Sequence, residues 1–199
     1  MHVHDCTIRN GDDCVPLNAP SRDVLVERLR CECGNGLVPI IWEGTSAGDP
    51  WDIRTHGGNI TNATFRDTVL SRTKLGITIK SLPMMTGTAQ DITFENIAVD
   101  QVGTAILIDT VSQDRGAGAI QQSPQRGLGV MHVKGIVIRN LTGTARVAGK
   151  FDCTQGSCAG IALSGLRLPA AATYSCAGDV TGTAAGCVPT PPSCLKPLQ

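Results

Sequence analysis

The amino-acid sequence predicts an all-β fold, most specifically a right-handed parallel β-helix. Short segments in which apolar and polar residues alternate recur along the chain, which is the periodicity of a half-buried strand. No window of useful length keeps the i, i+3, i+4, i+7 apolar spacing of an amphipathic helix. The alternating segments cover residues 3–9, 24–31, 59–67, 91–100, 135–142 and 159–168.

These segments share a short unit: an apolar residue, any residue, a polar residue that is often Asn, and another apolar residue. Such a unit cannot bury its apolar side alone, so stacking of successive turns is the natural arrangement, with variable insertions forming loops. A β-sandwich is the alternative, because short strands separated by turns also produce one. The units begin at Val3, Val26, Ile60, Phe94 and Ile138.

Asn62, Asn96 and Asn140 hold the polar position of three units. Asn is poor inside an isolated strand, but at the corner of a coil it tolerates left-handed backbone and can bond its amide to the turns above and below. We therefore interpret these residues as structural. Asn62 and Asn140 also begin glycosylation sequons, as Asn59 does; inward-facing corners would leave Asn59 as the better acceptor.

Composition limits the classes of function. The chain has 199 residues and 41% hydrophobic content, enough for one substantial core, and its formal net charge is zero. A neutral chain has neither a basic footprint for nucleic acid nor a polybasic membrane signal. No apolar run approaches the roughly 20 residues of a membrane span. We therefore expect neither nucleic acid nor membrane as a partner.

Nine cysteines indicate disulfides and an oxidising compartment. A zinc site is disfavoured because Cys31-Glu32-Cys33 has one intervening residue and no matching second pair, so we expect no metal and no cofactor. The first five residues contain no charged leader followed by an apolar segment. Either the protein is not secreted or the sequence begins inside a longer one.

Two regions are predicted: parallel β-helix coils over residues 1–168 and an irregular, disulfide-pinned cap over residues 169–199. The repeating pattern weakens from Cys158 onward, and proline interrupts regular strand pairing. A covered end also avoids an exposed sheet edge. The prolines concerned are Pro169, Pro189, Pro191, Pro192 and Pro197.

Asp12 and Asp13 are adjacent carboxylates, which repel each other unless they are separated, solvated or used as an acid and base pair. Neighbouring side chains of a strand point to opposite faces, so the pair can serve one site only if the backbone turns beside it. Gly11 provides a place for that turn. A solvated turn is the commoner explanation for an isolated Asp-Asp pair.

The surrounding sequence resembles glycoside hydrolase family 28, the polygalacturonases and their relatives. The resemblance begins with Val3-x-Asp5-Cys6-x-Ile8-x-x-Gly11-Asp12-Asp13-Cys14 and Cys31-x-x-Gly34-Asn35-Gly36, and it continues with Gly76-Ile77-Thr78-Ile79-Lys80. It then extends through residues 91–97 and 138–144 to Cys153-x-x-x-x-Cys158 and the terminal cysteines. The motifs follow the family order over nearly the whole chain, which makes the series more specific than any one motif.

The resemblance implies a secreted parallel β-helix that hydrolyses α-1,4-linked galacturonic acid in pectin with inversion at the anomeric carbon. Asp12 matches the general acid, and Asp13 matches a carboxylate that activates the attacking water, in keeping with the separated acid and base of an inverting hydrolase. Lys80 matches a lysine that binds the galacturonate carboxylate, and Asn35 takes the place of a histidine beside the substrate. The expected disulfides are Cys14–Cys31 and Cys153–Cys158, with the pairing of the last three cysteines left open.

Three departures from the family pattern predict weakened activity. The chain starts after the family's upstream Asn-Thr-Asp string, which implies that it is the C-terminal part of a longer solenoid. Asn35 cannot be protonated as the family's histidine can, and Thr78 replaces an arginine that would bind the substrate carboxylate. The alternatives are a non-catalytic β-helix that binds acidic cell-wall polysaccharide and a structural solenoid without a carbohydrate site. We expect a pectic polysaccharide partner, an extracellular or cell-wall location and, for the full-length protein, a monomer.

Four residues of the stretch after the second motif have less specific roles. Trp42 and Trp51 suit stacking on a sugar ring and equally suit burial. Glu43 would repel a polygalacturonate chain if it faced the groove, and a lone loop histidine such as His56 is more often solvated.

Overall fold

The computed structural model describes residues 1–41, 58–81, 86–110, 131–154 and 156–197. In this part of the chain every ordered element is a strand, and no helix is long and apolar enough to cross a membrane. The strands are β1 (His2–His4), β2 (Thr7–Arg9), β3 (Val15–Asn18), β4 (Ser21–Glu27), β5 (Arg30–Glu32), β6 (Leu37–Ile41), β7 (Gly58–Ser71), β8 (Leu75–Ser81), β9 (Gly87–Asp109), β10 (Met131–Asp152), β11 (Cys158–Ser164), β12 (Thr173–Ala177), β13 (Val180–Ala185) and β14 (Leu195–Pro197).

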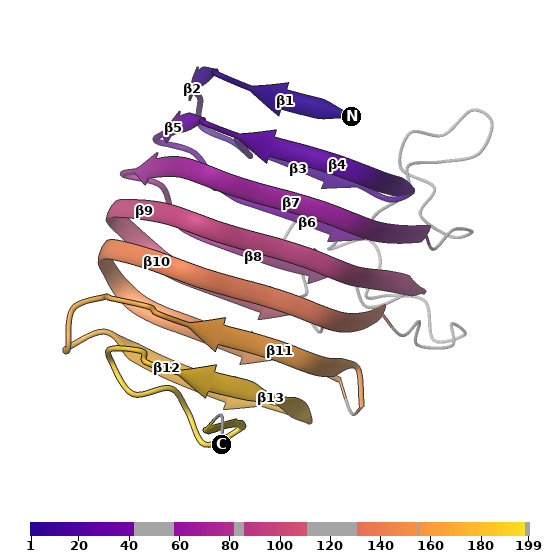
Figure 1. The fold of residues 1–199 in the computed structure, drawn as a ribbon, viewed down its shortest axis with the longest axis vertical. Coiled ribbons are helices and arrows are strands. Elements are labelled where there is room, and N and C mark those ends of the chain that lie inside the picture. The colour runs from indigo at the N-terminus through magenta and orange to yellow at the C-terminus, as the bar shows by residue number, and fades with distance from the viewer. Residues whose placement is uncertain (42–57, 82–85, 111–130, 155, 198–199) are drawn as a thin grey trace, which may run out of the picture.

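The strands stack along the long axis of the molecule, and successive coils lie side by side from the N-terminal to the C-terminal end (Figure 1). The first sheet contains β1, β4, β11, β13, β14 and the N-terminal parts of β7, β9 and β10. The second sheet contains β2, β5, the end of β7 and the middle of β9 and β10. The third sheet contains β3, β6, β8, β12 and the C-terminal parts of β9 and β10.

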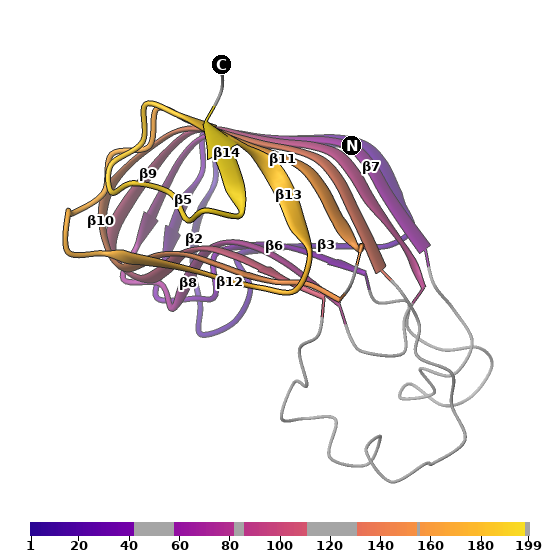
Figure 2. The same cartoon turned by 90° about the horizontal axis from the view of Figure 1, so that it is seen from below.

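Each coil runs around a common interior, which is visible when the molecule is seen from its end (Figure 2). All strand pairs among the described residues are parallel, and each joins a coil to the next. The prediction of an all-β parallel β-helix is therefore confirmed. The β-sandwich alternative is excluded, because its sheets would be antiparallel.

The interior is built from columns of apolar side chains that repeat from coil to coil. Val26, Phe65, Phe94 and Ile138 occupy one register position of the first sheet, and all four are fully buried. The Phe65 and Phe94 rings are stacked, with centroids 4.9 Å apart and planes 12° from parallel. Such columns bury the inward face that a single coil would leave exposed to water.

Residues with positive φ recur at three corners of the coils, and at two of these corners the expected repeat is corrected. Asp67, Asn96 and Asn140 share one corner, with φ of 52°, 55° and 54°. Asn62 lies at the preceding corner, in register with Asp23 and Asp91 rather than with Asn96. The short unit reads alike at both corners because each requires a residue that tolerates positive φ. The unit that begins at Ile60 therefore lies one corner earlier than the other units, and the prediction that it shares their corner is wrong.

The corner amides form the ladders expected of them. Asn96 Nδ2 donates to Asp67 Oδ1 at 2.9 Å, and Asn140 Nδ2 donates to Asn96 Oδ1 at 3.1 Å. At the other corner, Asn62 Nδ2 donates to Asp23 Oδ1 at 2.7 Å. The Asn62, Asn96 and Asn140 side chains are exposed, so these corners do not face inward.

The end of the chain continues the parallel pairing. β12 pairs with β10, β13 pairs with β11, and β14 pairs with β13. A Cys176–Cys194 disulfide joins β12 to the residue before β14. The predicted cap therefore contains three strands, and the boundary between coils and cap near residue 168 stays a prediction.

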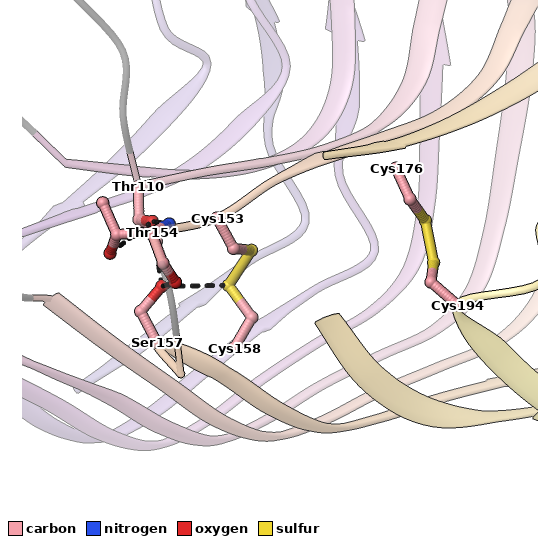
Figure 3. Close-up of a disulfide and its surroundings, with 7 residues drawn as sticks. All are labelled: Thr110, Cys153, Thr154, Ser157, Cys158, Cys176 and Cys194. Atoms are coloured by element: carbon pink, nitrogen blue, oxygen red, sulfur yellow. Dashed lines mark hydrogen bonds between the residues drawn. A yellow bond between two sulfur atoms is a disulfide. The ribbon is translucent and has the colours of Figure 1, made fainter. Parts of the chain in front are cut away.

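A second disulfide, Cys153–Cys158, closes the turn between β10 and β11, and buried hydroxyl groups surround it (Figure 3). The Thr110 and Ser157 hydroxyl oxygens lie 3.1 Å apart, and the Ser157 hydroxyl donates to the Thr154 carbonyl at 2.7 Å. The Thr154 N–H donates to Thr110 Oγ1 at 2.9 Å. The buried hydroxyl groups of this turn thus have hydrogen-bond partners, which avoids a desolvation cost of about 1–3 kcal/mol for each.

Charges alternate across the outer face of the first sheet. Glu27, Arg66, Glu95 and Arg139 hold one register position on successive coils. Arg66 Nε donates to Glu27 Oε2 at 2.7 Å, and Arg139 Nε donates to Glu95 Oε2 at 2.7 Å. The Glu27 side chain is only 5% exposed, and Arg28 and His2 also contact it. The hydrogen bond from Arg66, ahead of those from Arg28 and His2, lowers the pKa of Glu27 to about 2.

This lowered pKa predicts a loss of stability in acid. An ionised Glu27 stabilises the fold above its unfolded pKa of about 4.3, and the contribution is lost as the pH falls through the folded pKa of about 2. We expect a double-mutant cycle of Glu27→Gln and Arg66→Gln, followed by urea unfolding, to give a favourable coupling at pH 6 that fades between pH 4.5 and pH 2. A coupling that stays constant over that range would contradict this assignment.

Candidate active site

The Asp12–Asp13 pair lies in the turn between β2 and β3, at the corner where a coil enters the third sheet. The Asp13 N–H donates to Asp12 Oδ1 at 2.8 Å, and Asn10 Nδ2 donates to the Asp13 carbonyl at 3.0 Å. Asp12 is exposed, whereas Asp13 is half-buried. The Asp13 Oδ1 atom is buried and has no hydrogen-bond partner in the described part of the chain. The turn therefore gives two adjacent carboxylates different surroundings.

The next coil brings Asn35 against Asp12. Asn35 Nδ2 donates to Asp12 Oδ1 at 3.1 Å, and the Asn35 N–H donates to the Asp12 carbonyl at 2.9 Å. Gly34 permits this approach, because a Cβ there would lie 2.3 Å from the Asp12 carbonyl oxygen and 2.6 Å from Asn10 Oδ1. Asp12, Asp13 and Asn35, all chosen from sequence, thus lie together.

A disulfide fixes the strand that follows the acidic pair. Cys14 and Cys31 are bonded, with Cα atoms 6.0 Å apart, and both are buried. Cys31 lies in β5, so the bond joins the start of the third sheet to the second sheet of the next coil. Its loss would free a loop whose closure is worth about 3 kcal/mol in the chain-entropy model.

Lys80 lies elsewhere on the third sheet. Val15, Leu37 and Ile77 share one register position on three successive coils. Asp13 precedes this position by two residues and Lys80 follows it by three. The two residues are therefore two coils apart and are offset by five residues along the strand direction, which is roughly 17 Å. Its neighbours in register are Ile40 and Asp109. The structure therefore does not place Lys80 beside the aspartates.

Thr78 is fully buried, and its hydroxyl oxygen has no hydrogen-bond partner among the residues that the structure describes. It occupies the same strand as Lys80, two positions earlier, where the motif of the resemblance has an arginine. The short side chain brings no charge to this sheet. Trp42, Glu43, Trp51 and His56 lie outside the described residues.

Sequence reasoning missed two supporting residues. Asn10 anchors the turn through the Asp13 carbonyl, and Gly34 lets the two coils approach. Asn-Gly is a common turn dipeptide, so Asn10-Gly11 carried a signal for the first. The role of Gly34 depends on a contact between coils, which one coil's sequence does not reveal. Among the described residues, no group of three or more His, Cys, Asp or Glu could hold a metal ion.

The fold and the site define a parallel β-helix with a paired-carboxylate turn at one corner. The model of the family described as glycosyl hydrolases family 28 matches residues 1–187, and the chain belongs to that family.

Similar proteins include Polygalacturonase-2 of Solanum lycopersicum, 28% identical over 172 residues, with 84% of this chain and 34% of the relative covered. Polygalacturonase of Persea americana is 27% identical, with 92% of this chain and 38% of the relative covered. Endo-xylogalacturonan hydrolase from Aspergillus tubingensis shares the fold, with a TM-score of 0.68, 22% identity, and 94% of this chain and 50% of that chain covered. The chain thus spans between a third and two fifths of the two polygalacturonases' length.

Proposed function

We propose that the protein hydrolyses α-1,4-galacturonosyl linkages of pectin by inverting acid and base catalysis. The observation that carries the proposal is the Asp12–Asp13 turn, in which two adjacent carboxylates have different surroundings within a family 28 chain. The polygalacturonases among its relatives support pectin as the substrate class.

Asp12 is the proposed general acid. The Asn35 amide and the Asp13 N–H both bind Oδ1, and no donor among the described residues binds Oδ2. The exposed side chain can therefore carry its proton on Oδ2 and deliver it to the leaving glycosidic oxygen. Asn35 holds the carboxyl in one orientation, which supports a positioning role beside the substrate.

Asp13 is the proposed base, acting on the attacking water. Oδ1 is buried and accepts no hydrogen bond from the described residues, so Oδ2 of this half-buried side chain is the oxygen proposed to take the proton from water. In an inverting hydrolase, acid and base approach opposite faces of the sugar with room for water between them. The backbone turn beside Gly11, which separates the two side chains, supports this division of roles.

Lys80 is proposed to bind a substrate carboxylate on the third sheet, away from the bond that is cleaved. A lysine acts as a point charge that suits a polyanion. Its separation from Asp13 in register supports a contact with a sugar distant from the reacting one, or with a chain that crosses the sheet obliquely.

Three disulfides among the described residues support an extracellular location for the protein. The full-length protein is proposed to be a monomer, which light scattering would check.

Binding of the polysaccharide without cleavage is the alternative function. The buried Thr78 hydroxyl, which brings no cation to the sheet, favours this alternative over full activity.

Reducing-sugar release from polygalacturonate tests the function. We expect release by the protein and, by nuclear magnetic resonance, a first-formed product with inverted anomeric configuration. Binding to polygalacturonate without release would support the non-catalytic alternative. The absence of both binding and release would contradict the hydrolase proposal and the non-catalytic alternative.

A further inference from the structure

A groove of about 710 Å³ follows the corner between the second and third sheets, on the coils beyond Asn35. Its lining includes the cations Arg72, Lys74 and Arg146, the carboxylate Asp100, and Gly103. The function proposed above uses none of these residues.

Two of the three cations have no ion-pair partner among the described residues. Arg72 donates to Glu32 Oε2 at 3.3 Å, and Asp100 accepts a hydrogen bond from the Ser71 hydroxyl at 3.1 Å. Lys74 and Arg146 are exposed, and no acceptor among the described residues contacts either side-chain cation. The groove therefore holds two cations that are available to a ligand.

The two cations continue the line of the acidic turn. The Asn35 N–H donates to the Asp12 carbonyl at 2.9 Å, and the Lys74 N–H donates to the Gly34 carbonyl at 2.8 Å, so Lys74 lies two coils beyond Asp12. Thr104 pairs with Leu75 and with Val147, which places Arg146 two coils beyond Lys74. At the spacing of paired strands, each interval is roughly 10 Å.

Gly103 lines the groove on the coil between the two cations. A Cβ at this position would lie 2.4 Å from the Lys74 carbonyl oxygen, so only glycine fits. The backbone of Gly103 therefore forms part of the groove wall between Lys74 and Arg146.

We propose that Lys74 and Arg146 form an accessory binding site for the carboxylates of a uronate chain that extends from the Asp12–Asp13 turn along the solenoid axis. The proposal rests on the function proposed above. It adds a preference for substrates that carry carboxylates several sugars away from the cleaved bond. A chain with a carboxylate on every sugar can meet both cations at once. A neutral or fully esterified chain gains nothing from them.

The test is equilibrium binding in an Asp12→Asn background, so that hydrolysis does not enter. Isothermal calorimetry would compare galacturonate oligomers of three and eight sugars, and the methyl-esterified eight-sugar oligomer. Exposed ion pairs are worth up to about 1 kcal/mol, so Lys74→Gln and Arg146→Gln should each weaken binding of the long acidic oligomer by up to about fivefold. The double variant should also show a smaller dependence of affinity on salt.

The control is Lys134→Gln combined with Arg22→Gln, which removes the same charge from exposed positions on the first sheet. This control should leave the affinity unchanged. The accessory site would be overturned if the double variant and the control bound the acidic eight-sugar oligomer with equal affinity. It would also be overturned if the Asp12→Asn protein with Lys74 and Arg146 intact did not bind that oligomer. Both conclusions hold whether or not the protein hydrolyses pectin. A selective loss in the double variant would support the site even if the unmutated protein released no sugar.

Discussion

Asp12→Asn should lower the rate of reducing-sugar release from polygalacturonate by about a thousandfold. An amide keeps the shape of the carboxyl, and its oxygen can still accept the hydrogen bonds from the Asp13 N–H and the Asn35 amide. It cannot, however, supply a proton to the leaving oxygen, and a positioned acid contributes about 10²–10⁴ in rate. Initial rates at saturating substrate would measure the loss as kcat.

An Asp179→Asn variant is the matched control. Its carboxylate is also exposed, but it lies between β12 and β13, far along the solenoid from the turn. It should retain the full rate, and both variants should keep the unfolding midpoint of the parent protein. If Asp12→Asn stays within about threefold of the parent rate, Asp12 is not the acid.

The same chemistry separates the roles of the two aspartates. A galacturonide with an acidic phenol as leaving group needs no proton at departure, so it should restore much of the activity of Asp12→Asn. Asp13→Asn should stay inactive on that substrate, because activation of water is still required. Recovery of activity by Asp13→Asn alone would reverse the two roles. Recovery by both variants would remove the assignment of a base to Asp13.

Phe94→Ala should lower the free energy of unfolding by about 3–5 kcal/mol, the range for removing a buried aromatic ring. Phe94 is fully buried and stacks on Phe65 of the preceding coil, so truncation opens a cavity between two coils. Urea unfolding with the disulfides oxidised would measure the change, provided that the slope with urea stays that of the parent.

Thr93→Ala is the control for this substitution. Thr93 precedes Phe94 on β9 and points to the outer face, where it is half-buried and makes no hydrogen bond that the structure records among the described residues. Its loss should cost less than about 0.5 kcal/mol. A loss below about 1 kcal/mol for Phe94→Ala would show that the coils relax to fill the cavity.

Sequence reasoning reached the fold because alternation and repetition are properties of each coil. It reached the Asp12–Asp13 turn because Gly11 marks a bend beside adjacent acids. It misplaced Asn62, since both corners accept the same residues. Strand alternation predicts that Thr78 faces outward, so its full burial could not be foreseen. The alignment of Lys74 with Arg146 could not be foreseen either, because it depends on which coils are neighbours.

The likeness of the two corners bears on how the chain finds its winding. If Asn96 stacked on Asn62 instead of Asp67, the corner amides could bond as before, but Phe94 would then lie over Ile60 rather than Phe65. Corner hydrogen bonds therefore cannot reject a coil that has slipped by one corner. The shape of the interior column, above all the matched rings of Phe65 and Phe94, has to make that choice during folding.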